Sequence, residues 1–289
     1  MLPQDRFFKY AVIAPAIFFI LLIGLYPFIK LLVTSFQNID MFADDRGFHG
    51  LIHYDRLFDD SRLWGAILRT VVFTAVALPL QLFLGFLLAV LFVNRMPLRQ
   101  VFIAVLLLPV VISPIVAGAT WRLMLDHRFG PVNQVIGWFA GGEVELLWTV
   151  EPLLVWPAIM VAEVWQWTPF MFLLLLAALA SVDREQLEAA ELDGASWWMT
   201  FRSVVLPAIM PVVVIALLIR GLDLIRIFDI VWTMTRGGPG TMTETISIYA
   251  YQMAFREFDI SYSAAIALLI IIMLTALVVG VLSRVEISR

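Results

Sequence analysis

Four charged residues stand in a row inside an otherwise apolar stretch of the chain. Arg220, Asp223, Arg226 and Asp229 alternate in sign at intervals of three residues within 207–232. Neighbours three apart on a helix lie close enough to pair, so the row could neutralise itself. Ionisable side chains in hydrocarbon are costly and mark functional sites by default, so some of the row could instead bind a hydroxyl-rich or anionic solute. We expect Arg220 to be mainly paired within the protein, with Asp223 one turn away as a ready partner, and Asp223, Arg226 and Asp229 are the candidates for solute contact.

A second group of candidate binding residues lies in the preceding apolar stretch. The segment EVWQWTPF places Trp165 and Gln166 shortly before Pro169. An aromatic face with an amide alongside suits a sugar ring, although Trp near a broken helix commonly serves packing or interfacial anchoring. Pro169 predicts a kink whose freed carbonyl could line a pathway. Trp165 and Gln166 therefore join the candidates for a solute path.

The sequence offers little for catalysis or metal binding. The chain contains no Cys, which excludes thiol chemistry and Cys-ligated metals. We interpret His49 and His53 as solvated loop residues rather than metal ligands, and His127 stands alone. No Ser/His or paired-carboxylate arrangement occurs within the apolar runs, and no phosphate-binding G-x-x-x-x-G-K-[ST] loop is present. We expect a chain that is not an enzyme and that holds neither a metal nor a nucleotide itself.

Composition indicates which solvent surrounds these candidate residues. Apolar residues make up 62% of the 289 and charged residues only 15%, more apolar surface than a soluble core can hide. A membrane span needs about 20 mostly apolar residues. Six runs meet that length, at about 10–36, 66–93, 101–125, 153–180, 207–232 and 262–282. We therefore expect an all-α integral membrane protein with six transmembrane helices, forming a single transmembrane domain over residues 1–289.

Orientation follows from the basic residues of the connecting segments. Arg95 and Arg99 lie in the turn 94–100 without an acidic residue, and Arg6 and Lys9 precede the first span. The positive-inside rule places these segments in the cytoplasm, so both termini are expected there. The first span continues past the length of a signal-peptide core and lacks a small-residue cleavage site, so we expect it to remain uncleaved.

The polar segment 181–206, SVDREQLEAAELDGASWWMTFRSVVL, connects the fourth and fifth spans. Asp183 and Gln186 resemble a capping box at the start of a helix, and Gly194 stands where a left-handed C-terminal residue is wanted. Ser196 could cap a second helix that lies at the membrane surface, and Pro207 suits the first turn of the next span. Such a pair could be an interfacial connection only, or it could contact a partner.

The same segment resembles the cytoplasmic EAA loop of permease subunits in binding-protein-dependent ABC importers. The family pattern is E-A-A, three residues, Gly, nine residues, Ile, one residue, Leu-Pro. Val204 stands in place of the Ile. The remaining positions match at the same spacing, and they are Glu188, Ala189, Ala190, Gly194, Leu206 and Pro207.

Two further stretches extend the resemblance over most of the chain. The segment 235–255 is similar to the GGP segment of the first permease subunit in maltose and glycerol-phosphate type importers, with Gly237, Gly238 and Pro239. The segment 121–138 resembles the outer loop of that group. Arg236 stands where that group often has Gly.

The resemblance implies a type I ABC importer permease in the bacterial inner membrane, with lipid around it. It would pair with a second, different permease subunit, above two copies of an ABC ATPase that bind ATP and Mg, and below an extracytoplasmic solute-binding protein. The EAA helix would transmit closure of the ATPase. The solute would be a sugar, polyol or related compound. No basic stripe indicates nucleic acid. An ion-coupled secondary transporter is the alternative, although no internal repeat supports it.

Overall fold

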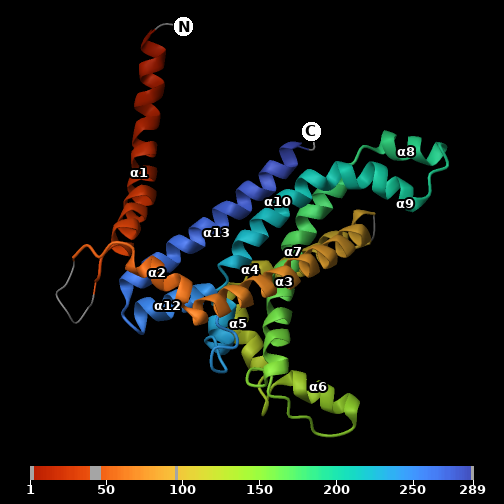
Figure 1. The fold of residues 1–289 in the computed structure, drawn as a ribbon. Coiled ribbons are helices and arrows are strands. Elements are labelled where there is room, and N and C mark those ends of the chain that lie inside the picture. The colour runs from red at the N-terminus through yellow and green to blue at the C-terminus, as the bar shows by residue number, and fades with distance from the viewer. Residues whose placement is uncertain (1–2, 40–46, 95–96, 288–289) are drawn as a thin grey trace. The chain divides into compact units, whose positions relative to one another are not determined.

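The computed structural model describes residues 3–39, 47–94 and 97–287. Within these residues, all the secondary-structure elements longer than an isolated β-bridge are helices. In chain order the elements are α1 (Pro3–Ser35), α2 (Ile52–Asp59), α3 (Ser61–Val93), α4 (Arg99–Val111), α5 (Pro114–Met124), α6 (Pro131–Ala140), α7 (Pro152–Ala180), α8 (Arg184–Leu192), α9 (Trp197–Thr200), the π-helix η1 (Phe201–Val205), α10 (Leu206–Ile225), α11 (Asp229–Thr235), α12 (Ile246–Phe255) and α13 (Ile260–Ile287) (Figure 1). The chain divides into two compact units, Met1–Leu63 with Tyr249–Leu277, and Trp64–Ile248 with Val278–Arg289. They are called the first and second units below.

Five helical stretches of the described residues are long and apolar enough to cross a membrane, and α4 with α5 makes a sixth when counted as one bent span. The stretches are Val12–Ser35, Ser61–Val93, Pro152–Ala180, Trp197–Thr235 and Ile260–Ser283. At about 1.5 Å rise per residue, each exceeds the hydrocarbon thickness of a bilayer. The predicted all-helical membrane fold is confirmed, with corrections at the third and fifth spans.

The third span, expected as one helix over 101–125, is two helices. α4 and α5 meet at an angle of 97°. Pro114 lies in the first turn of α5, where its missing N–H costs little, and the Ile112 carbonyl loses its helical partner at the bend. A side-chain amide of a neighbouring helix replaces that partner, because Gln166 Nε2 on α7 donates to the Ile112 oxygen at 2.8 Å. The sequence permitted a kink here but did not predict so sharp a bend.

The fifth span, expected as one helix over 207–232, also ends early. α10 stops at Ile225, and Arg226 leaves helical geometry with φ −99° and ψ 20°. The chain resumes as the short helix α11 at Asp229. The charged row is therefore divided, with Arg220 and Asp223 on α10 and the other two residues at the break. The four charges therefore do not lie on one continuous helix.

The core of the second unit is built around α7. In the most apolar 18-residue stretch of α7, 61% of the residues are buried, compared with 28% in that of α3. Of these two helices, α7 is therefore the more enclosed. Apolar side chains of four helices meet there, from Phe73 and Ala77 on α3, Ile159 and Ala162 on α7, Leu224 on α10, and Ile230 and Val231 on α11. Because α7 is 29 residues long, the segments at its two ends are far apart. Figure 1 shows α6 at one end of α7 and α8 with α9 at the other.

In the first unit, the carboxylate of Asp60 joins three helices. Its Oδ1 accepts the backbone N–H groups of Arg62 and Leu63 at 3.0 Å each, which satisfies the start of α3. Its Oδ2 accepts the hydroxyls of Tyr249 on α12 and Tyr262 on α13 at 2.5 Å each. Burial disfavours the charged form, but these hydrogen bonds outweigh it and hold the pKa of Asp60 below its ordinary value.

Two further predictions concern His53 and the basic turn 94–100. His53 is not a solvated loop residue, because it lies on α2 with 7% exposure and its ring Nε2 bonds the Gln37 carbonyl at 3.0 Å. Arg95 of the predicted cytoplasmic turn lies outside the described residues. Its neighbour Arg99 begins α4, and its Nε donates to the carbonyl of Phe92 near the end of α3 at 2.7 Å. A cation at that position favours the negative end of a helix.

Candidate functional site

The start of α8 is fixed by its own side chains. Asp183 has the extended backbone of an N-cap and its Oδ1 accepts the N–H of Glu185 at 3.0 Å. Gln186, the expected second member of a capping box, returns no bond to Asp183 among the described contacts. Ser196 likewise caps α9, because its Oγ accepts the N–H of Met199 at 3.3 Å. Both predicted helix starts are therefore confirmed.

The end of α8 has the geometry that the sequence indicated. Gly194 has φ +73°, in the left-handed region. Its N–H donates to the carbonyl of Glu191, and the N–H of Ala195 donates to that of Ala190, both at 3.0 Å. This pair of bonds is the Schellman arrangement, which satisfies the last carbonyls of a helix. A Cβ at Gly194 would meet nothing within 4 Å, so only backbone strain favours glycine here.

No residue of α8 is buried, so the whole helix is accessible to a partner. Glu188 and Ala189 are exposed and Ala190 is half-buried. The sequence analysis missed two apolar residues beside them, Leu192 and Trp197, which are 89% and 71% exposed. An apolar residue next to the Gly194 turn, followed by a Trp, was the available signal, because such exposed groups indicate a contact surface.

The second helix of this segment differs from the expectation. α9 does not lie separately at a membrane surface, because its C-terminal residue continues into η1 and then into α10 with helical backbone angles throughout. Leu206 begins α10 half-buried, and Pro207 stands exposed in its first turn. The five π-helical residues of η1 change the register between α9 and α10, and such insertions occur frequently at functional sites.

A charged cavity of about 330 Å³ lies within the second unit, away from α8. It receives three of the predicted solute-path residues, Asp223, Arg226 and Asp229. Its full lining is Pro114, Glu163, Trp167, Arg220, Asp223, Arg226, Ile227, Phe228, Asp229 and Ile230. The break between α10 and α11 forms much of this wall, so the irregular backbone lies beside a cavity, where membrane proteins tolerate it.

Arg220 is the most enclosed charge of the cavity wall, with 1% of its side chain exposed. Its shortest ion pair joins Nη2 to Glu163 Oε1 at 2.6 Å, whereas Asp223 is 3.5 Å from Nη1. Its Nε donates to Gln81 Oε1 at 3.1 Å, and its guanidinium lies 4.3 Å from the centre of the Trp167 ring. Arg220 is therefore paired within the protein, as expected, but its closest partner is not Asp223. The partner that sequence analysis did not assign is Glu163, 57 residues away on α7.

The outer charges of the cavity are more accessible. Arg226 Nη2 donates to Asp223 Oδ1 at 2.7 Å, with side-chain exposures of 62% and 32%. Asp229 begins α11 and also faces the cavity. The wall thus carries three carboxylates and two guanidinium groups, so it offers both acceptors and donors of hydrogen bonds. Such a surface can bind hydroxyl groups, which both donate and accept.

Trp165 and Gln166 do not line this cavity. Trp165 is 38% exposed and its ring meets that of Trp121 edge to face at 5.8 Å. Gln166 is fully buried and holds the Ile112 carbonyl at the α4–α5 bend, while its Oε1 has no partner among the described residues. The structure therefore brings together the α10–α11 candidates, but it leaves Gln166 at the bend and Trp165 against Trp121 on α5.

The GGP segment forms a compact turn after α11. Gly237 has φ +91°, and its carbonyl accepts the N–H of Thr243 at 3.1 Å. The Thr243 hydroxyl donates to the Gly238 carbonyl at 2.7 Å, and Pro239 lies in the enclosed loop. Arg236 adopts φ +55°, a conformation that glycine takes more easily. This backbone requirement explains why a glycine would suit that position.

Comparison with known proteins identifies the family. The model of "Binding-protein-dependent transport system inner membrane component" matches residues 58–286. The Trehalose/maltose transport system permease protein MalF of Thermococcus litoralis is 33% identical over 260 residues, covering 90% of this chain and 87% of its own. The Lactose transport system permease protein LacF of Rhizobium radiobacter is 29% identical, covering 92% and 89%.

Solved structures agree on the fold. A chain from the crystal structure of a bacterial ABC transporter involved in the import of the acidic polysaccharide alginate has a TM-score of 0.84 at 21% identity, over 97% of this chain and 96% of that one. Because the family model matches most of the chain and similar relatives cover most of its length, this protein belongs to the family of binding-protein-dependent transport system inner membrane components.

Proposed function

We propose that this chain is one of two different permease subunits of an ATP-driven importer for a sugar, polyol or related solute. The observation that carries the proposal is α8, a capped helix without a buried residue at one end of α7, with the family pattern from Glu188 to Pro207. The names of the similar relatives, which transport trehalose, maltose and lactose, support a carbohydrate. The whole chain would act as one transmembrane permease domain.

The coupling role falls to the loop 181–206. Glu188, Ala189 and Ala190 would contact a groove of the ATPase, since α8 leaves them at least partly exposed. Gly194 would keep the helix end compact, and Leu206 and Pro207 would connect the loop to α10. Closure of the ATPase would then move α8 as a rigid body and shift the permease between inward-open and outward-open states. ATP and Mg would be held by two copies of that ATPase.

The solute path would pass the charged cavity. Arg226 presents an exposed fork of donors, and Asp223 and Asp229 present acceptors, a combination suited to vicinal hydroxyl groups. Of the two α7 candidates, Gln166 would act at the α4–α5 bend and Trp165 where its ring meets that of Trp121 on α5. Both chain termini and the α8–α9 end of α7 would face the cytoplasm, and an extracytoplasmic binding protein would deliver the solute at the other end.

Reconstitution tests this function. The permease pair and the ATPase would be purified together, placed in liposomes, and supplied with a loaded binding protein. We expect uptake that requires ATP and the binding protein and that persists when ion gradients are dissipated with ionophores. Uptake by this chain alone, driven by a proton or sodium gradient, would instead make it a secondary transporter.

A further inference from the structure

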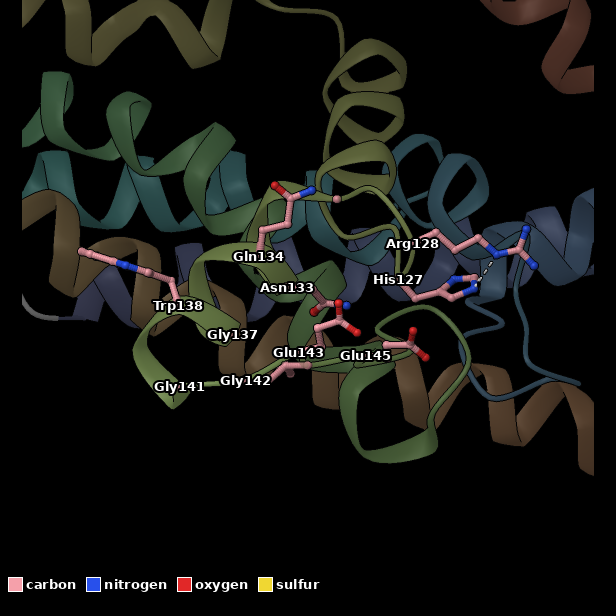
Figure 2. A pocket seen from close by; sticks show the side chains of 12 residues that line it. His127, Arg128, Asn133, Gln134, Gly137, Trp138, Gly141, Gly142, Glu143 and Glu145 are labelled. Carbon is pink, nitrogen blue, oxygen red and sulfur yellow. Dashed lines mark hydrogen bonds between the residues drawn. The ribbon is translucent and has the colours of Figure 1, made fainter.

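The end of α7 opposite α8 carries a hollow that the solute path does not use. It has a volume of about 710 Å³ and is lined by His127, Arg128, Gly130, Asn133, Gln134, Gly137, Trp138, Gly141, Gly142, Glu143, Val144 and Glu145. Figure 2 shows that these side chains come from three consecutive segments, namely the turn before α6, α6 itself and the chain that follows it. All three lie between α5 and α7, outside the apolar stretches.

The walls of the hollow are held in place by the segment's own contacts. Asn133 on α6 is 4% exposed, its Nδ2 donates to the Leu146 carbonyl at 3.0 Å, and its Oδ1 accepts the indole N–H of Trp148 at 2.7 Å. These bonds fix α6 to the chain leading into α7. At Gly130 an added Cβ would lie 2.3 Å from the backbone oxygen of Asp126, so the turn before α6 accepts only glycine. The hollow is therefore preformed rather than shaped by a ligand.

Four exposed side chains near the hollow make few contacts with the rest of the chain. Trp138 and Phe139 are 79% and 78% exposed, and their rings contact each other at 4.8 Å. Glu143 and Glu145 are exposed, and neither forms a hydrogen bond or ion pair with another described residue. Two large aromatic side chains beside two free carboxylates are the composition of a protein contact surface with a charged rim.

The charge of the segment indicates which partner fits. Between residues 126 and 151 there are four acidic residues and one arginine, a formal charge of −3 with histidine neutral. Hydrogen bonds from the N–H groups of Arg128 and Phe129 hold the pKa of Asp126 below its ordinary value, so it stays ionised. Charges of opposite sign on two proteins attract each other and steer their encounter. The negative charge beside the exposed aromatic pair is thus suited to a protein with a basic patch.

We propose that this face, formed by Trp138, Phe139, Glu143 and Glu145, docks the extracytoplasmic binding protein through a basic patch, with one partner side chain entering the preformed hollow. The inference rests on the proposed function, since it requires the α6 end of α7 to be outside. Carboxylates at the rim would speed the encounter electrostatically, and the aromatic pair would slow dissociation.

Binding kinetics of the purified binding protein on the assembled transporter in nanodiscs test the proposal. The Glu143→Lys/Glu145→Lys variant should lower the association rate constant about tenfold at low salt, and the difference from wild type should shrink as salt screens the charges. Trp138→Ala/Phe139→Ala should raise the dissociation rate constant about tenfold instead. Asp59→Lys, an exposed reversal on α2, is the matched control and should behave as wild type.

Each outcome separates the two proposals. If both double variants bind with wild-type rates, the α6 face is not the docking surface, although the permease function stands. If the aromatic variant alone loses binding, and only in nanodiscs that contain anionic lipid, the face contacts membrane and the proposal is overturned. If no binding protein stimulates ATP hydrolysis by the wild-type complex, the proposed function fails first. ATP hydrolysis without binding protein, measured for every variant, confirms intact assembly.

Discussion

The two arginines of the charged cavity, Arg220 and Arg226, differ strongly in the solvent exposure of their side chains. Arg220 is 1% exposed and bonded to Glu163 and Gln81, whereas Arg226 is 62% exposed with Asp223 as its partner. Removing one member of a buried ion pair leaves an uncompensated charge, at a cost of about 3–5 kcal/mol. We therefore expect Arg220→Ala to reduce the yield and the Tm of the purified complex.

The same comparison predicts the opposite behaviour for Arg226→Lys. Lysine keeps the charge but lacks the planar fork of donors, so the apparent KM for uptake should rise several-fold while complex yield stays at the wild-type level. Uptake kinetics and yield, measured on both variants, check the assignment. An unchanged KM in Arg226→Lys, together with an altered solute preference in Arg220→Ala, would show that the two roles are exchanged.

Asp60 provides a prediction about pH. Its folded-state pKa is lowered, so the carboxylate contributes stability above the ordinary aspartate pKa, near 4, and loses it as pH falls through the lowered value. Asp60→Asn should cost about 1–3 kcal/mol at neutral pH, because two tyrosine hydroxyls lose a charged acceptor. Its Tm should also fall less than that of wild type below pH 4. The exposed Asp59→Asn should match wild type at every pH, and an identical acid response in Asp60→Asn would refute the assignment.

At the scale of elements, α8 can be tested through its last turn. Gly194 has φ +73° with open space around it, so a substitution acts through backbone strain alone. Gly194→Val should cost about 1 kcal/mol or more and distort the end of the helix, whereas asparagine tolerates the left-handed conformation. We expect Gly194→Val to lower ATP hydrolysis stimulated by the binding protein and Gly194→Asn to retain most of it, at equal expression. Full stimulation in Gly194→Val would exclude the proposed coupling role of this turn.

The elements also show what the sequence could predict. The caps at Asp183 and Ser196 and the turn at Gly194 were predictable, because each depends on residues within a few positions. The sharp bend after Ile112 was not, because it is stabilised by Gln166 from another helix. The closest partner of Arg220 was missed for the same reason, since periodicity within one span reveals neighbours at three or four residues, such as Asp223, but not Glu163 on α7.

For the whole molecule, the second unit joins two exposed ends through α7. One end carries α8 and α9, the other carries α6, and the charged cavity lies within the same unit. The proposed contacts with an ATPase and with a binding protein require these two ends to face opposite sides of the membrane. The 29 residues of α7 extend about 43 Å at 1.5 Å per residue, which is sufficient for that separation.

Labelling of single cysteines tests this arrangement most directly, because the chain contains none of its own. Ser196→Cys lies in the turn between α8 and α9, and Gln134→Cys lies on the exposed side of α6. A thiol reagent that cannot cross the inner membrane, applied to cells with a permeabilised outer membrane, should label Gln134→Cys and not Ser196→Cys. In inverted inner-membrane vesicles, the same reagent should label Ser196→Cys and not Gln134→Cys. Labelling of Ser196→Cys from outside intact cells, or of both positions from the same side, would contradict the account.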